Sequence, residues 1–236
     1  MNQSVPLKTP APLFRLLLVL SATTGMVDAA SILGMDKVFT ANMTGNVVFL
    51  AFATVGSPGF HPLSYVVALA AFMAGAAIAG RLWRSNGTPR LNHWLVLAAA
   101  IESCLLFLAG LLGLYAAKMG APDSTVLLPC IIALTAGAMG FRNAIVRQLK
   151  VPDLTTTVLT LTITGIAADS RPASGTTSNL PARLGAVLAI FAGAAAGALI
   201  FHTLGLGPTL LVTAGVVLVA TTIFVRHPQM AELQRK

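Results

Sequence analysis

The sequence predicts an all-α fold: a polytopic transmembrane helical bundle with six long spans and two short polar segments that re-enter or are broken. Of its 236 residues, 56% are apolar and only 9% are charged, whereas soluble domains carry about 25% charged residues. The apolar residues also come in long blocks, and a helix needs roughly 20 of them to cross a bilayer. Lipid is therefore the solvent that suits this chain.

Six apolar blocks are long enough to cross the membrane once each. The first follows a polar, Pro-rich N-terminal arm, residues 1–12, and it exceeds the apolar region of a signal peptide, so we interpret it as an uncleaved span. Residues 13–225 then form one membrane domain, and residues 226–236 form a short tail. The long blocks are Leu13–Leu33, Pro62–Gly80, Leu95–Ala117, Val126–Ile145, Leu184–Leu204 and Pro208–Val225.

Two further blocks, Val38–Val55 and Asp153–Ala168, are shorter and crowded with Thr, Asn and Gly. The positions of the fifteen Lys and Arg residues decide whether they cross, because cytoplasmic flanks collect basic residues. If both blocks return to the side they came from, an internal N-terminus leaves only Lys37 and Lys118 outside. Eight crossings would leave eight basic residues in the cytoplasm and seven outside. We therefore expect six crossings with both termini in the cytoplasm.

A seven-span topology is a close alternative. It has an external N-terminus, only the first short block crosses, and the basic residues divide twelve to three. In either topology the formal net charge of +8 reflects basic cytoplasmic loops and a basic tail. No aromatic interleaving or nucleic-acid motif accompanies these residues. We therefore expect the lipid bilayer, and no nucleic acid, as a partner.

Catalytic chemistry has little support in the sequence. Neither a nucleophile elbow, an HExxH motif nor a Walker-type loop is present. Cys104 and Cys130 lie inside predicted spans and show neither metal-site spacing nor a disulfide framework. We expect a protein that is not an enzyme and that holds no metal or other cofactor.

The two halves of the membrane domain resemble each other in order. The segment Gly25–Ala29 corresponds to Gly140–Ala144, and Phe72–Ala77 corresponds to Ile190–Ala195. Each half contains a long span, a short polar block and two more long spans. Because three crossings per half is an odd number, the second copy starts from the opposite side, which predicts an inverted repeat. The repeats comprise about residues 13–117 and 126–225.

The two short blocks supply most of the candidate site. Non-helical backbone at membrane depth is tolerated only inside protein or beside a watery cavity, where amides and hydroxyls serve as neutral donors and acceptors. We expect Gly45 to let the backbone turn. Alternatively, the Thr hydroxyls bond their own helix carbonyls and the small residues allow close helix packing. The candidate substrate-binding residues here are Asn42, Thr44, Gly45, Asn46, Thr156 and Thr160.

Ionisable side chains within the spans are few, and such groups normally face the bundle interior. Glu102 and Arg142 lie at similar depths in consecutive antiparallel spans, which predicts a structural ion pair, with a proton or substrate role as the alternative. Asp28 corresponds to the neutral Asn143 in the second half, and we add both residues to the candidate site. A lone carboxylate there carries a proton or attracts a cation. Alternatively, Asp28 braces the polar turn by accepting backbone hydrogen bonds from the segment around Asn42.

Two motifs carry a resemblance to a known family. Val27–Ser31 together with Phe39–Asn46 resembles the signature of the YoaK family of small bacterial membrane proteins, and Gly140–Ala144 with Thr156–Thr160 resembles that family's second motif. The family motif commonly continues Thr-Gly, whereas a leucine follows Thr160 here. The resemblance covers nearly the whole chain and implies a bacterial inner-membrane protein. It implies no substrate, because the family has none assigned.

These features predict a transporter or channel for a small solute or ion, with a polar site formed by the two short segments. Nothing in the sequence indicates an ATPase, so a gradient would supply the driving force. The alternative is a non-transporting membrane protein that binds a partner or a lipid and uses the polar segments only for folding. The sequence names no substrate and leaves the oligomeric state open.

Overall fold

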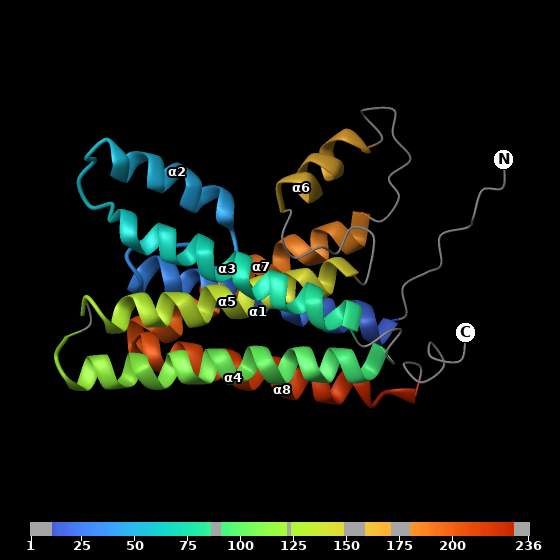
Figure 1. Cartoon of the computed structure of the whole chain (residues 1–236). Coiled ribbons are helices and arrows are strands. Elements are labelled where there is room, and N and C mark those ends of the chain that lie inside the picture. Colours follow the sequence, from blue (N-terminus) through green and yellow to red (C-terminus); the bar gives the residue numbers. More distant parts are fainter. Residues whose placement is uncertain (1–10, 86–90, 122–123, 149–158, 171–179, 229–236) are drawn as a thin grey trace.

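The computed structural model describes residues 11–85, 91–121, 124–148, 159–170 and 180–228, in which every regular element is a helix (Figure 1). The all-α prediction is confirmed, and six of the described helices are long and apolar enough to cross a membrane. The helices are α1 (Ala11–Gly34), α2 (Met43–Thr54), α3 (Pro62–Ser85), α4 (Leu91–Lys118), α5 (Leu127–Gln148), α6 (Leu159–Ala168), α7 (Leu180–Leu204) and α8 (Leu206–Val225).

The long helices follow the predicted spans closely. The largest differences are at the end of α3, which continues to Ser85, and at the starts of α4 and α7, which begin four residues early at Leu91 and Leu180. The α3 extension adds Arg81 and Arg84, which are good helix formers, and the α4 extension adds the polar residues Asn92 and His93. Hydropathy marks the part of a helix that lies in hydrocarbon, and backbone hydrogen bonding continues beyond it.

The two short blocks form helices that are too short to cross the bilayer. α2 has 12 residues and α6 has 10, so their lengths are roughly 18 and 15 Å at 1.5 Å per residue. The hydrocarbon core is about 30 Å thick. In the first block, residues 38–42 form an irregular segment before α2 begins. Asp153 to Val158 of the second block lie outside the described residues.

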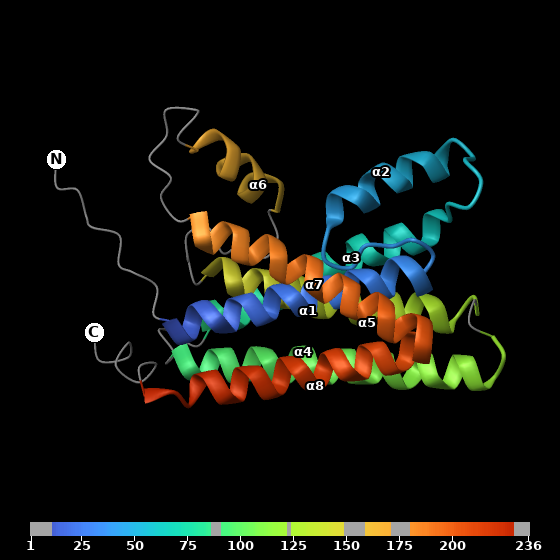
Figure 2. The same ribbon diagram turned by 180° about the vertical axis from the view of Figure 1, so that it is seen from behind.

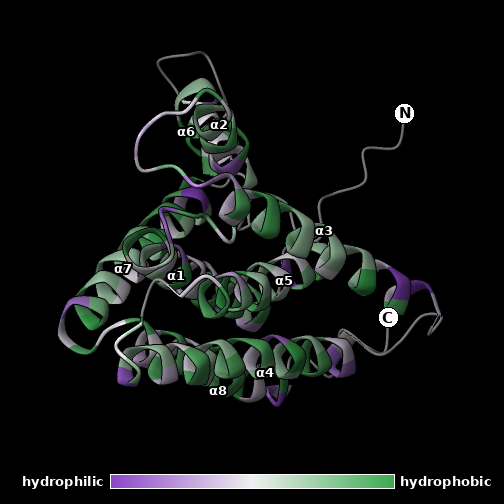
Figure 3. Cartoon of the chain, turned by 60° about the vertical axis from the view of Figure 1, so that its left-hand side comes forward, coloured by the Kyte–Doolittle hydropathy of each residue, from purple (hydrophilic) through white to green (hydrophobic). Residues whose placement is uncertain are grey.

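The six long helices pack in antiparallel and crossed pairs. α1 packs against α7, α3 against α5, and α4 against α8, while α5 also contacts α4 and α1 contacts α8. In Figure 3, α4 and α8 form a base, α1 and α5 lie above it between α7 and α3, and α2 and α6 lie at the apex. α2 rests on α3, and α6 rests on α7.

Backbones approach very closely where the crossed helices meet. A Cβ on Gly25 of α1 would overlap the carbonyl oxygen of Ile190 in α7, and a Cβ on Gly140 of α5 would overlap that of Phe72 in α3. Lipid offers no hydrophobic driving force between helices, so close van der Waals packing through small residues holds them together. These glycines therefore fix the two crossings.

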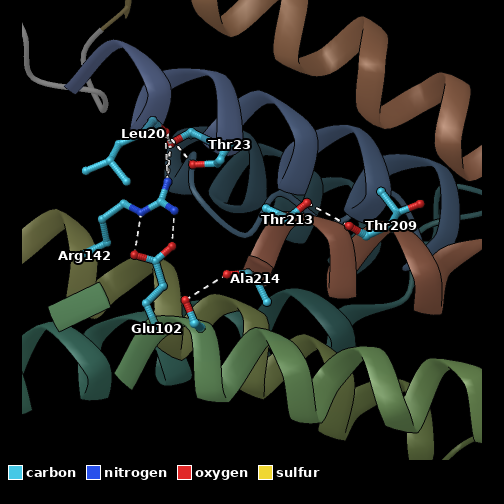
Figure 4. Close-up of polar contacts among 9 residues, drawn as sticks. Leu20, Thr23, Glu102, Arg142, Thr209, Thr213 and Ala214 are labelled. Carbon is cyan, nitrogen blue, oxygen red and sulfur yellow. Dashed lines mark hydrogen bonds and ion pairs between the residues drawn. The ribbon is translucent and has the colours of Figure 1, made fainter. Parts of the chain in front are cut away.

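Side-chain hydrogen bonds join the helices of the base. The Ser103 hydroxyl of α4 donates to the carbonyl of Ala214 in α8 over 3.0 Å (Figure 4). Nearer the ends of the two helices, the Asn92 amide donates to the Val225 carbonyl over 3.4 Å. Such bonds act as polar links between membrane helices. The base is thus tied together at two depths.

Candidate functional site

The chain reverses sharply after α1 and runs back into the bundle. Asp36 and Lys37 both have φ of 58°, the left-handed region that non-glycine residues rarely adopt. The Asp36 carboxylate lies 2.6 Å from Nδ1 of His61 and accepts a 2.8 Å hydrogen bond from the Ser64 hydroxyl. Tyr65 donates its hydroxyl to the Asp36 carbonyl over 3.2 Å. The start of α3 therefore holds the reversal in place.

The returning segment meets Asp28 in the body of α1. The Ala41 N–H donates to Oδ1 of Asp28 over 3.2 Å, and the Asn42 side-chain amide donates to Oδ2. α2 begins at the next residue, Met43. Asp28 thus makes the contact that a brace of the polar turn requires, and it brings the candidate residue Asn42 against the first span.

Asn46 is used entirely to hold the turn. It is fully buried, its Oδ1 accepts the Phe39 N–H over 2.9 Å, and its Nδ2 donates to the Phe39 carbonyl over 2.5 Å. Asn46 is one of the predicted substrate-binding residues, and these bonds to Phe39 leave its side-chain amide little hydrogen-bonding capacity. Asn46 and Phe39 are seven residues apart in the sequence. Composition alone does not indicate which backbone group an asparagine side chain will bond.

Gly45 does not make the backbone turn, as the sequence analysis expected. Gly45 lies in the first turn of α2, and its φ is not positive. The Phe39 ring occupies the space where its side chain would lie, because a Cβ there would overlap the ring. Gly45 is therefore a packing position under the aromatic ring, and the chain reverses at Asp36 and Lys37.

The N-terminal end of α2 lies beside the body of the apolar helix α1. Asp28, which contacts it, is six residues before the end of α1 at Gly34, or roughly 9 Å along the helix axis. The first turn of a helix carries unpaired N–H groups and a partial positive charge, and Asn42 makes no side-chain cap hydrogen bond to it. Asn42 and Thr44 are exposed beside these groups.

α6 enters from the opposite end of the bundle. Nη1 of Arg183, near the start of α7, lies 2.6 Å from Oδ2 of Asp169, just after α6 ends. The Leu159 end of α6 therefore lies roughly 15 Å further along, toward the middle. Figures 1 and 2 show α2 and α6 on one side of the bundle with their inner ends facing each other. Thr160 is exposed near the inner end of α6, and Thr156 lies outside the described residues.

Asn143, the counterpart of Asp28, lies on α5 and is partly buried. Its Nδ2 atom is inaccessible to solvent, and the described part of the chain offers it no hydrogen-bond partner. The two corresponding positions thus differ in chemistry. In the first half, a carboxylate accepts hydrogen bonds from two donors of the polar turn. In the second half, a neutral amide donor has no partner among the residues that the structure describes.

Glu102 and Arg142, predicted as an ion pair, are in contact in the bundle core (Figure 4). Arg142 Nε donates to Glu102 Oε2 over 2.8 Å, and Nη2 contacts Oε1. Nη1 reaches across to α1, where it donates to the Leu20 carbonyl over 3.0 Å and to the Thr24 hydroxyl over 2.9 Å. Both charged side chains are almost completely buried. This network ties α5 to α4 and α1.

A small cavity of about 20 Å³ adjoins the pair and is lined by Glu102, Arg142, Thr221 and apolar side chains. This is room for one water molecule. Among the described residues, no three His, Cys, Asp or Glu side chains gather as metal ligands would. The site therefore consists of hydroxyls, amides, the Asp28 carboxylate and helix ends.

Six apolar helices of membrane-spanning length, with two half-length helices between them, define a multi-pass integral membrane protein. The chain belongs to the family described as a protein of unknown function, DUF1275, whose model matches residues 16–223. It is similar to the UPF0700 transmembrane protein YoaK of Bacillus subtilis (strain 168), with 32% identity over an alignment of 162 positions that covers 65% of each chain. No solved structure matches. The YoaK-like family predicted from the two motifs is confirmed.

Proposed function

We propose that the protein moves a small solute or ion across the bacterial inner membrane through the polar region where α2 and α6 begin. One observation carries this proposal: two helices too short to cross start at membrane depth and run toward opposite ends of the bundle. Unpaired backbone groups at that depth need protein or water around them. Half-length helices that meet near the midplane form the substrate and ion sites of many transporters.

The packing supports an inverted repeat with α1–α4 as one copy and α5–α8 as the other. Exchanging the copies converts the α1–α7 pair into the α5–α3 pair, the α4–α5 contact into the α8–α1 contact, and α2 on α3 into α6 on α7. The close contact of Gly25 with Ile190 has its counterpart in that of Gly140 with Phe72. Transporters with inverted repeats bind their substrates at the interface between the copies.

Each candidate residue has a part in the proposed path. Asn42 and Thr44 from the first copy and Thr160 from the second offer exposed amide and hydroxyl groups to a solute. Asp28 supplies the carboxylate beside them, and the Arg142 network holds α1 against α5. Neutral donors and acceptors suit a small polar solute or a partly hydrated ion. A gradient drives the movement, no covalent chemistry is involved, and both termini are cytoplasmic.

The proposal is tested by flux into vesicles containing the purified protein, with protons, sodium, potassium, chloride and small neutral metabolites as the panel. Thr44→Val removes one hydroxyl at nearly constant shape, and Thr222→Val, at a half-buried position on α8, is the matched control. The loss of a hydrogen bond worth about 1.4 kcal/mol lowers flux about tenfold. We expect this loss for Thr44→Val and none for the control.

A folded protein that moves nothing in the panel would contradict transport. It would favour a membrane protein that binds a partner or lipid, since the bonds of Asp28 and Asn46 to the turn also serve a purely structural segment. Asp28→Asn refines the test, because the amide oxygen still accepts the Ala41 N–H. If Asp28 carries a proton, this variant loses flux and its pH dependence at normal stability, which is the result we expect. An unchanged pH profile would leave Asp28 as a brace.

A further inference from the structure

We propose that the ion pair between Asp36 and His61 is a pH-sensitive clasp, which docks the polar turn on α1 when the medium at that end of the bundle is acidic. In the proposed topology this end faces the outside of the cell. The regulatory role rests on the proposed function, since the docked turn holds Asn42 against Asp28 in the candidate site.

The reversal that the clasp holds is unfavourable by itself. Asp36 and Lys37 are consecutive residues with φ of 58°, and a Cβ makes this left-handed conformation costly. Such a conformation persists only when the surrounding structure holds it, and strained residues of this kind cluster at switch regions. Weakening a contact that holds Asp36 therefore shifts the turn away from this conformation.

The start of α3 supplies the contacts that hold the reversal. The Asp36 carboxylate lies 2.6 Å from Nδ1 of His61 and accepts the Ser64 hydroxyl over 2.8 Å, while the Asp36 carbonyl accepts the Tyr65 hydroxyl over 3.2 Å. Ser64 and Tyr65 are buried, whereas the His61 side chain is 68% exposed. Of these three partners, the imidazole is therefore the one that exchanges protons freely with the medium.

The turn and α2 form one unit that reaches α1 at the candidate site. The chain after α1 runs back along the bundle before α2 begins (Figure 2), and both bonds of Asn46 fix Phe39 to α2. This unit contacts α1 through the bonds that Ala41 and Asn42 donate to Asp28. A turn that leaves its strained conformation carries these donors away from the carboxylate. The state of the clasp therefore decides whether the site is assembled.

The sign of the pH effect follows from the charge of the imidazole. A histidine gains its positive charge as the pH falls from about 8 to 5. The imidazolium attracts the Asp36 carboxylate, whereas the neutral ring keeps only a hydrogen bond, so the clasp is stronger in acid. An ion pair this exposed shifts an equilibrium by up to about fivefold. Asp169, just after α6, pairs instead with Arg183, and arginine stays charged throughout this range. Of these two pairs, the one at His61 therefore responds to pH.

Other titratable side chains lie near this end of the bundle. Lysine and tyrosine change charge well above pH 8, so a change between pH 5 and 8 comes from a histidine or a carboxyl group. His202 is such a histidine, since it follows Phe201, which lines a cavity of about 380 Å³ together with Asp36. Asp28 is such a carboxyl group in the docked contact itself. The nearby groups on the turn, α3, α4 and α7 are Lys37, Tyr65, Lys118 and His202.

The clasp is tested by cysteine modification of the full chain in vesicles, with the two native cysteines replaced by alanine. Ala41→Cys is buried in the turn and keeps the N–H that Asp28 accepts, and Ala51→Cys on the exposed side of α2 is the matched control. The reagent is methyl methanethiosulfonate, and the ratio of the two rates cancels the effect of pH on thiols. We expect this ratio to rise about three- to fivefold from pH 5 to pH 8. Val38→Cys, a nearly isosteric change at a fully buried position, should give the same rise.

Three background variants separate the clasp from the other titratable groups. His61→Gln keeps a donor without charge, so the ratio should stay high at both pH values. His61→Arg supplies the permanent cation that Asp169 already uses and should keep the ratio low at both, while His202→Gln should leave the rise intact. A flat ratio with His61 in place, a rise that survives His61→Gln and so belongs to Asp28, or a rise lost in His202→Gln would overturn the clasp.

Flux measured in parallel keeps the clasp separate from transport. At a fixed driving gradient, flux should fall about three- to fivefold as the external pH rises from 5 to 8, and His61→Arg should keep its acid value throughout. A modification ratio that rises with pH in vesicles without flux would leave the clasp standing and overturn the proposed function. Flux that is sensitive to Thr44→Val, together with a flat ratio, would do the reverse.

Discussion

Replacing Glu102 by Gln should strongly destabilise the protein, because it removes the negative partner of a buried cation. Arg142 would keep its bonds to the Leu20 carbonyl and the Thr24 hydroxyl, but neither acceptor carries charge. Both charged side chains are 2–3% exposed, so water does not replace the carboxylate. Breaking a buried pair at one partner costs about 3–5 kcal/mol, and we expect a loss of that size in the free energy of unfolding.

The free energy is measured by SDS-induced unfolding in mixed micelles. Asp169→Asn is the control, because Asp169 is 49% exposed in its pair with Arg183 and such pairs contribute about 0–1 kcal/mol. The double variant Glu102→Leu with Arg142→Met removes both charges and should lose less than Glu102→Gln alone. A Glu102→Gln loss below about 1 kcal/mol, or a double variant less stable than the single one, would refute this reasoning.

Three further variants test the framework around the site. Gly25→Ala should destabilise the protein by about 1–3 kcal/mol, because its methyl group meets the α7 backbone. The control Gly215→Ala places its methyl group in open space and should change stability by less than about 1 kcal/mol. Equal effects of the two variants would contradict the close crossing of α1 and α7. Asn46→Ala should cost about 1–3 kcal/mol in the same SDS titration by leaving the Phe39 backbone unpaired, and a neutral result would remove its positioning role. Cysteine at Ser57 should react with an impermeant maleimide from outside the cell, and cysteine at Ser85 only after permeabilisation; the reverse pattern would invert the topology.

The long spans and the ion pair were predictable because both depend on simple regularities. Block length against bilayer thickness determines which helices cross, and counting residues from one membrane face places Glu102 and Arg142 at one depth. Burial cost then requires that two opposite charges meet. The additional bonds of Arg142 to Leu20 and Thr24 were not predictable, because they depend on how α1 crosses α5.

The polar turn shows where sequence reasoning stopped. Asn42 and Asn46 belong to one short motif, yet one amide is exposed against Asp28 and the other is buried on the Phe39 backbone. Composition marks both as polar and gives neither partner. Asp36 was missed altogether, although an acidic residue at the end of the first span, just before the polar block, was a usable signal. Its hydrogen-bonding partners His61 and Ser64 follow α2 in the sequence, so only the folded chain brings them to Asp36.

The glycine crossings determine which parts of this molecule move as units. Where Gly25 lies on the backbone of α7, no side chain separates the helices and none is available to change rotamer, so α1 and α7 shift together; the same holds for α3 and α5 at Gly140. Packed elements have discrete arrangements and do not deform continuously. We therefore expect any change of shape to proceed by one crossed pair rocking on the other, with the bonds from Arg142 to α1 near the pivot.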